Sequence, residues 1–402
     1  MTFLTAYAIC MLVFMYRYRG PDPGFFLFLA CALSALFLYR RRLPARPDRH
    51  SHIAAYDRIR LLAMILVIAT HTISANTFNP ENPDARLLPV NAAMAVWAVT
   101  IVCNPLYVML SGCFLYAKKE KNLLSFYWDK FLRVLLPMFL YYLWYLWAHE
   151  RLIGQPQAIP VSEAMRDFFS MGPSLAPHMW LIWRILFLYL TAPLMGRLLR
   201  ALSYRRLTIL FFICMAVSSV ITYLPLAANI GIVRNEWPEW LLAAAAGWWL
   251  SRNETRRFDT ALIAAGLISG ILIGLYAWYH AEDPLLSLFV CNTAPLAILL
   301  AMGIGALMLH LSGKPSGSGL LALLTEYNYD MVLIHWGALY FIVRQLPAVR
   351  VISLPLPLLT VLEIPLTLAV SLCAAFGIRR FFVYPVVTLL SRAASAIHFS
   401  EN

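Results

Sequence analysis

The sequence predicts an all-α, polytopic integral membrane protein in which a two-helix hairpin precedes a ten-helix core. Three observations predict this class. Hydrophobic residues make up 61% of the 402 residues and charged residues only 13%, whereas soluble domains average about 45–50% and about 25%. Apolar runs long enough for membrane helices recur along the chain, separated by short polar loops. The basic residues gather in alternate loops, as expected when those loops face the cytoplasm.

The first 50 residues are expected to form an accessory transmembrane hairpin and a basic linker. Residues 2–16 and 24–40 are apolar, and a turn rich in Gly and Pro separates them. The first run is short for a full crossing. It lacks the basic start and the cleavage site of a secretory signal, so no signal is expected. Five arginines follow between positions 40 and 49, interrupted by Pro44 and Pro47.

The core is expected over residues 51–390, and residues 391–402 are expected to form a cytoplasmic tail. Ten apolar segments divide the core. Their approximate ranges are 58–78, 90–116, 131–149, 179–197, 207–224, 237–250, 260–279, 286–310, 328–345 and 357–378. The segment 237–250 is short enough to tilt or to be re-entrant.

Loop charges orient these spans. With the 40–60 linker in the cytoplasm, the loops and tail on that side hold 23 Lys and Arg residues and the opposite side holds 8. This bias predicts cytoplasmic termini. The net charge of +12 is therefore explained without a nucleic-acid partner. The seven cysteines lie in apolar segments and form no CxxC pair, so neither a disulfide framework nor a metal site is expected.

His71 is the outstanding polar residue of the first core span. It follows Arg60 by eleven residues, which places it about 16 Å further along a helix, near the middle of an apolar layer about 30 Å thick. A titratable side chain at that depth is costly and marks a candidate functional site. Histidine suits proton transfer near neutral pH. The alternative is a structural histidine that bonds to a neighbouring helix.

Arg60, ten residues and then His71 resemble the arginine–histidine signature of the type 3 membrane acyltransferases. Four further stretches are similar to motifs of that family, in the expected order, and extend the resemblance over roughly residues 56–380. They are 104–115 with Ser111-Gly112, 126–137 with Lys130 and Arg133, 178–181 with His178 and Trp180 followed by Tyr189 and Pro193, and 327–335 ending in His335. The chain departs from the pattern at Asp330, where the family often has a tyrosine or an apolar residue, and at Leu106 and Tyr107, where an aromatic pair is usual.

The resemblance implies a ten-helix enzyme that O-acylates carbohydrate outside the cytoplasm. His71 and Arg60 are then the catalytic candidates. Arg58, Arg60, Lys130 and Arg133 are candidates for binding the phosphates of coenzyme A, which needs cationic donors at the cytoplasmic face. The alternative for these cations is anchoring at the membrane surface. Ser111-Gly112 also fits a close contact between helices.

Four residues are candidates for binding the acceptor: His178, Trp180, Arg184 and His335. Trp180 offers an aromatic face for a sugar, or an interfacial anchor. Arg184 lies within an apolar span and needs a partner or a cavity, with Glu239 and Glu363 as possible carboxylates. A structural ion pair is the alternative. His335 lies about two turns into its span, where a structural role is equally open.

The sequence thus predicts an O-acyltransferase, most simply an O-acetyltransferase, that uses cytoplasmic acetyl-CoA or another short acyl-CoA and no metal. The acceptor is a cell-surface polysaccharide or a lipid-linked saccharide. A bacterial inner membrane and a polysaccharide-synthesis complex are the expected setting. Two alternatives remain: a saccharide carrier or flippase without acyl transfer, and a non-catalytic scaffold.

Overall fold

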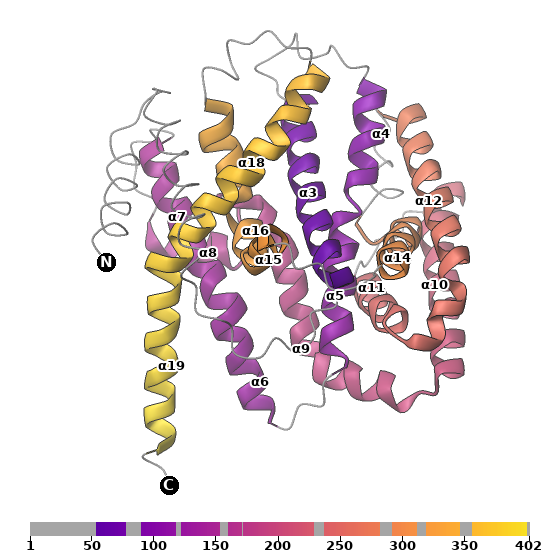
Figure 1. Ribbon diagram of the computed structural model, residues 1–402, viewed down its shortest axis with the longest axis horizontal. Helices are drawn as coiled ribbons and strands as arrows, with labels where there is room; N and C mark the ends of the chain where they lie inside the picture. Colours follow the sequence, from indigo (N-terminus) through magenta and orange to yellow (C-terminus); the bar gives the residue numbers. More distant parts are fainter. Residues whose placement is uncertain are drawn as a thin grey trace. The chain divides into compact units, whose positions relative to one another are not determined.

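The computed structural model describes residues 54–77, 90–117, 122–152, 160–170, 172–228, 237–281, 292–311, 319–345 and 356–399. All regular structure in these ranges is helical (Figure 1). The predicted hairpin in residues 1–50 lies outside the described residues.

Fifteen α-helices are described in these ranges. They are α3 (Ala54–Thr77), α4 (Val90–Thr100), α5 (Cys103–Leu115), α6 (Leu123–Lys130), α7 (Leu136–Leu152), α8 (Val161–Phe168), α9 (Trp180–Ala201), α10 (Tyr204–Ala228), α11 (Trp237–Leu250), α12 (Asp259–Tyr279), α14 (Pro295–His310), α15 (Gly319–Glu326), α16 (Asn328–Gly337), α18 (Leu356–Ile378) and α19 (Tyr384–Phe399). Short 3₁₀ segments are η3 (Pro177–Met179), η4 (Asn253–Phe258) and η6 (Val343–Gln345). Short π segments are η2 (Phe131–Leu135), η5 (Ala338–Ile342) and η7 (Arg379–Val383).

Seven helical stretches within the described residues are long and apolar enough to cross a membrane. They are 55–77, 90–115, 123–149, 177–201, 204–223, 253–279 and 357–391. Each corresponds to a predicted span, so the membrane class is confirmed, whereas the count of ten is not. The other three predicted spans contain shorter helices. For example, α11 has 14 residues and a length of about 21 Å, less than the apolar layer of about 30 Å.

The chain divides into two compact units, and within the described residues the boundaries fall inside α6, inside α9 and between α15 and α16. The described residues of unit 1 lie within 128–183 and 327–399, and those of unit 2 lie within 54–127 and 184–326. The described part of each unit is therefore assembled from two separate segments of the chain.

Glycines allow close contacts between helices in unit 2. At the crossing of α5 and α11, a Cβ on Gly112 would lie 1.9 Å from the carbonyl oxygen of Ala244, and a Cβ on Gly247 would lie 1.9 Å from that of Met109. The predicted small-residue contact at Ser111-Gly112 is thus confirmed. Helices α12 and α14, labelled next to each other in Figure 1, also pack closely.

The helices α10 and α12 present large apolar side chains outward. In α10, Ile209, Phe212 and Ile213 are exposed, and in α12, Leu267 and Ile268 are exposed. An outward apolar surface on such helices is what contact with lipid tails requires, because the hydrocarbon layer offers no water to polar groups.

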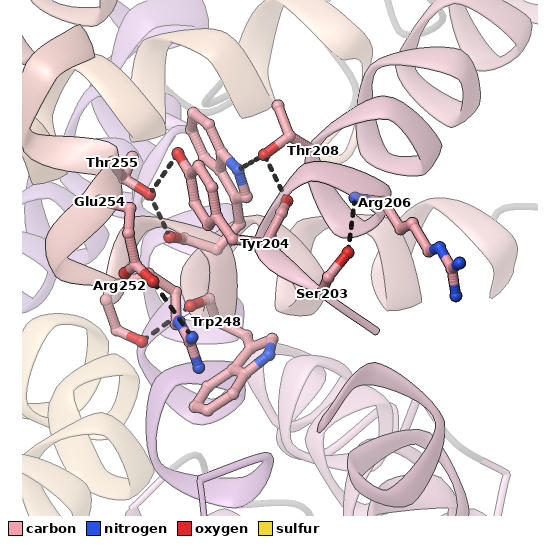
Figure 2. Close-up of polar contacts among 10 residues, drawn as sticks. Ser203, Tyr204, Arg206, Thr208, Trp248, Arg252, Glu254 and Thr255 are labelled. Carbon is pink, nitrogen blue, oxygen red and sulfur yellow. Dashed lines mark hydrogen bonds and ion pairs between the residues drawn. The ribbon is translucent and has the colours of Figure 1, made fainter. Parts of the chain in front are cut away.

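A polar network fixes the basic turn between α11 and α12 (Figure 2). The indole Nε1 of Trp249 donates to Thr208 Oγ1 at 2.9 Å, and Thr255 Oγ1 donates to the Trp249 carbonyl at 2.7 Å. The Tyr204 hydroxyl lies 3.2 Å from Thr255 Oγ1. These bonds join the start of α10 to the end of α11 and to η4, so a loop predicted to face the cytoplasm has a defined structure.

Candidate active site

Asp57 and Phe114 contact Arg60 within unit 2. Its Nη1 lies 2.8 Å from Asp57 Oδ1, one turn earlier in α3, and its Cζ lies 5.0 Å from the centroid of the Phe114 ring. The side chain is 26% exposed. A guanidinium held by a carboxylate at its edge and by an aromatic ring at its face has a restricted orientation, which favours binding of a planar or forked anionic group.

His71 lies on the same helix face as Arg60. Eleven residues of a regular α-helix turn the chain through three full turns and about 20°, with a rise of about 16 Å. Because α3 is an uninterrupted α-helix from Ala54 to Thr77, this relation applies to the two side chains directly. His71 is partly buried. The spacing thus places a cation and an imidazole on one line along α3.

Neighbouring helices hold α3 beside His71. The Thr70 Oγ1 lies 2.9 Å from Thr100 Oγ1 at the end of α4. Six residues earlier, the Met64 sulfur accepts a long hydrogen bond of 3.8 Å from the Tyr107 hydroxyl of α5. These contacts position the helix that carries both catalytic candidates.

Arg58 makes a structural contact. Its Nη1 donates to the Leu311 carbonyl at 3.3 Å, just beyond the last residue of α14. An arginine at a helix C-terminus satisfies a carbonyl that has no helical partner and is favoured by the helix dipole. The predicted donor-binding role of Arg58 therefore competes with a capping role.

Lys130 and Arg133, the donor-binding candidates of unit 1, share one carboxylate. Lys130 Nζ lies 3.3 Å from Asp129 Oδ2, and Arg133 Nε lies 2.5 Å from Asp129 Oδ1. Arg133 is 75% exposed. The exposed pair of Arg133 with Asp129 contributes little to stability, whereas Lys130 is only 23% exposed.

His178 and His335 are brought together inside unit 1, although 157 positions separate them in the sequence. Their ring centroids are 4.9 Å apart in an edge-to-face arrangement, and both residues are buried. The ring of Tyr145 lies 5.3 Å from that of His178, and Trp336 stacks on His178 at 6.2 Å. Two residues predicted separately as acceptor-binding groups thus form one cluster.

Backbone carbonyls fix the tautomers of this histidine pair. His178 Nε2 lies 3.0 Å from the Leu333 carbonyl, and His335 Nδ1 lies 2.8 Å from the Val332 carbonyl. Because a carbonyl can only accept, both of these nitrogens carry hydrogen. In the neutral rings, the basic nitrogens are therefore His178 Nδ1 and His335 Nε2.

Asp167, which sequence reasoning did not single out, organises the segment that leads to His178. Its Oδ1 accepts hydrogen bonds of 2.7 Å from the backbone N–H and from the hydroxyl of Ser174, and its Oδ2 accepts one of 2.8 Å from Tyr142. Burial raises the pKa of Asp167, but the hydrogen bonds from Ser174, Tyr142 and Leu175 outweigh it and hold the pKa below its usual value. Asp167 is therefore ionised at neutral pH.

The remaining acceptor candidates lie on α9. Trp180 is its first residue, and Arg184 follows one turn later, on the same face; both are partly buried. Glu239, a predicted partner of Arg184, is buried in unit 2 and accepts hydrogen bonds from hydroxyls. Its Oε1 accepts from Ser218 at 3.3 Å and from Thr222 at 3.1 Å, and its Oε2 accepts from Thr293 at 3.0 Å. Glu363 is buried in unit 1.

The predicted site residues divide between the two units. Arg58, Arg60, His71 and Arg184 belong to unit 2, and Lys130, Arg133, His178, Trp180 and His335 belong to unit 1. Their roles stay predictions. In the part of the chain that the structure describes, no three His, Cys, Asp or Glu side chains are grouped as a metal ion would require.

The described part of the chain has apolar helices of membrane-spanning length together with buried histidines and carboxylates. It is therefore a polytopic membrane protein with polar groups in its interior. A family model, Acyl_transf_3, described as an acyltransferase domain, matches residues 53–380, and the chain belongs to this type 3 acyltransferase family. It is therefore an integral membrane enzyme that transfers acyl groups other than amino-acyl groups. No curated protein and no solved structure matches the chain.

Proposed function

We propose that this enzyme transfers an acetyl group, or another short acyl group, from cytoplasmic acyl-CoA to a hydroxyl of a carbohydrate beyond the membrane. The acceptor is a surface polysaccharide or a lipid-linked saccharide. Membership of the acyltransferase family supports acyl transfer over a carrier that performs no chemistry. The charge bias of the loops supports a cytoplasmic position for Arg60.

The alignment of Arg60 and His71 on one face of α3 carries this proposal. A charged donor cannot cross the apolar layer, whereas its acyl group must reach an acceptor on the other side. In this proposal Arg60 binds the anionic end of the donor, and His71 lies about 16 Å further along the helix, deeper in the membrane. Acyl-CoA carries its thioester at the end of a long flexible arm, which suits such a separation.

The reaction exchanges one bond for another. The acceptor hydroxyl oxygen forms a bond to the acyl carbonyl carbon, and the carbon–sulfur bond of the thioester breaks. The hydroxyl proton is transferred to the departing thiol sulfur. His71 either takes this proton as a general base or first accepts the acyl group on its ring and then passes it on.

The other candidates contribute to binding in this proposal. Arg58, Lys130 and Arg133 support the phosphates of the donor on the cytoplasmic side. His178, Trp180, Arg184 and His335 contact the acceptor, because imidazole and guanidinium groups bond to hydroxyls and an indole packs on the apolar face of a sugar. The proposed setting is a bacterial inner membrane with both termini in the cytoplasm, beside a polysaccharide-synthesis complex.

The test is the O-acyl content of surface polysaccharide, measured by mass spectrometry in cells that express the wild type, His71→Ala or Arg60→Ala. Both variants should lose acylation, and Arg60→Lys should retain part of it. Arg206→Ala is the matched control, because Arg206 is an exposed cation of unit 2 outside the site. Normal acylation by a stably expressed His71→Ala protein would refute the catalytic role.

A second measurement separates the two routes open to His71. Purified protein is mixed with radiolabelled acetyl-CoA in the absence of acceptor and quenched rapidly. Label attached to the wild type but not to His71→Ala indicates an acylated histidine. If no label attaches to the wild type, although the same protein transfers the acetyl group once acceptor is added, the result indicates general-base catalysis.

A further inference from the structure

Asp330, the position at which the sequence departs from the family pattern, has a defined set of partners in unit 1. It lies in the first turn of α16 and is buried. Arg379 Nη1 lies 3.2 Å from its Oδ2, and the Tyr141 hydroxyl donates to its Oδ1 at 3.1 Å. A buried carboxylate is stable only when it is paired and hydrogen-bonded, and here each oxygen has a donor.

Two neighbouring side chains restrict the orientation of Arg379. It is the first residue of η7, directly after α18, and Asp330 holds one edge of its guanidinium. The Arg379 Cζ also lies 5.1 Å from the centroid of the Tyr327 ring. The Arg379 side chain is 35% exposed, whereas that of Asp330 is only 7% exposed. The Arg379 side chain therefore has a buried anchor and is itself partly exposed.

Two other cations lie in helical segments that pack near Arg379 in unit 1. Helix α16 is tied to η2 by the Tyr329 hydroxyl, which donates to the Val134 carbonyl at 2.8 Å, and η7 packs against α7. Lys130 and Arg133 therefore belong to the same end of unit 1 as Arg379. Because these cations come from different segments of the chain, folding of unit 1 is what gathers them.

We propose that Arg379 binds a phosphate group of the coenzyme A donor, with Asp330 and Tyr327 as its positioning residues. The inference deepens the proposed function and rests on it, since it takes acyl-CoA as the donor. A guanidinium has five N–H donors in a planar fork that matches phosphate oxygens. Because Asp330 and Tyr327 restrict its orientation, less conformational entropy is lost when the anion binds.

A purely structural ion pair between α16 and the segment after α18 predicts a different outcome. Breaking such a pair would disturb binding of any donor fragment to the same extent. A phosphate contact affects only ligands that carry phosphate. Coenzyme A and pantetheine, its phosphate-free fragment, therefore distinguish the two roles.

The experiment measures dissociation constants of coenzyme A and of pantetheine for the purified full-length protein by calorimetry. Arg379→Gln should weaken coenzyme A binding by about 10- to 100-fold, the loss expected for a charge-assisted hydrogen bond, and leave pantetheine binding unchanged. Arg380→Gln is the matched control, because this adjacent exposed arginine undergoes the same change of charge, and coenzyme A binding should change less than about 3-fold. Should Arg379→Gln fail to fold, Arg379→Lys keeps the charge but loses the fork and should still weaken coenzyme A binding.

Asp330→Asn tests the positioning role. It removes a negative charge, so a simple charge effect would strengthen binding of an anion. Loss of positioning should instead weaken coenzyme A binding while pantetheine binding is kept. Equal losses for both ligands in Arg379→Gln, or no loss for coenzyme A, would overturn the inference. A wild-type protein that binds neither coenzyme A nor acetyl-CoA would instead refute the proposed function.

Discussion

The contact between α5 and α11 makes Gly112→Ala a strong test of the packing in unit 2. The added Cβ would lie 1.9 Å from the Ala244 carbonyl oxygen and 2.6 Å from the carbonyl carbon of the same residue. Both atoms belong to the backbone of α11, so no side-chain rotation relieves the overlap. The substitution therefore forces the two helices apart.

The size of the effect follows from this geometry. Ordinary contacts begin at 3.4 Å, so the two backbones must separate by about 1.5 Å at the crossing. A gap of 0.5–1 Å already forfeits about a quarter to a half of the dispersion energy of the atoms concerned. Overpacking in a close-packed interior costs about 1–3 kcal/mol, and a backbone clash is at the upper end of this range. We expect a loss of about 3 kcal/mol.

Thermal unfolding of the detergent-solubilised protein, followed by size-exclusion chromatography after heating, measures this loss. The midpoint of Gly112→Ala should be lower than that of the wild type by about 4 °C. Gly274→Ala in α12 is the matched control, because its added Cβ would lie 3.7 Å from the Val99 side chain, an ordinary contact. Alanine also favours the helix by up to about 1 kcal/mol, so this control should be as stable as the wild type or more stable. Equal midpoints for the two variants would refute the reasoning.

Two further predictions concern single polar contacts. Asp167→Asn should destabilise the protein at neutral pH. Because the pKa of Asp167 is lowered on folding, the stabilisation is fully present above the usual aspartate value of about 4 and is lost as the pH falls through the lower folded-state value. The difference in thermal midpoint between wild type and variant should thus be constant above about pH 5 and vanish in stronger acid; a difference that persists unchanged at pH 3 would contradict this. Arg58→Ala should lower stability by about 0.5–1 kcal/mol through loss of the contact with Leu311, measured in the same assay with Arg205→Ala as an exposed control. Unaltered stability would exclude capping as its role.

The membrane helices were largely predictable because hydrophobic length is a local property. The span predicted at 58–78 is α3, at Ala54–Thr77, and the one predicted at 237–250 is α11, at Trp237–Leu250. The segment between 150 and 178 was less predictable. Its short helix α8 depends on the burial of Phe168 and on the bond from Tyr142, a residue about 20 positions earlier.

The sequence predicted the candidate site residues, but not which distant residues contact one another. Arg60 and His71 follow from one helix and its period, so their common face could be derived from sequence spacing. The pairing of His178 with His335 could not be derived, since each residue lies in a different span. Asp330 was recognised only as a departure from the family pattern. The presence of an aspartate at a usually apolar position indicated a nearby cation, because a buried carboxylate requires a paired charge.

The sequence by itself determined that this chain is a helical membrane protein, because water-excluded segments must satisfy their backbone hydrogen bonds internally. It also determined that Arg60 and His71 lie on the same face of α3. Only the tertiary structure decided which distant groups meet: Gly112 with Ala244, and Asp330 with Arg379. Such contacts depend on how helices cross, and the crossing is selected by packing over whole helix surfaces, which no local stretch of sequence specifies.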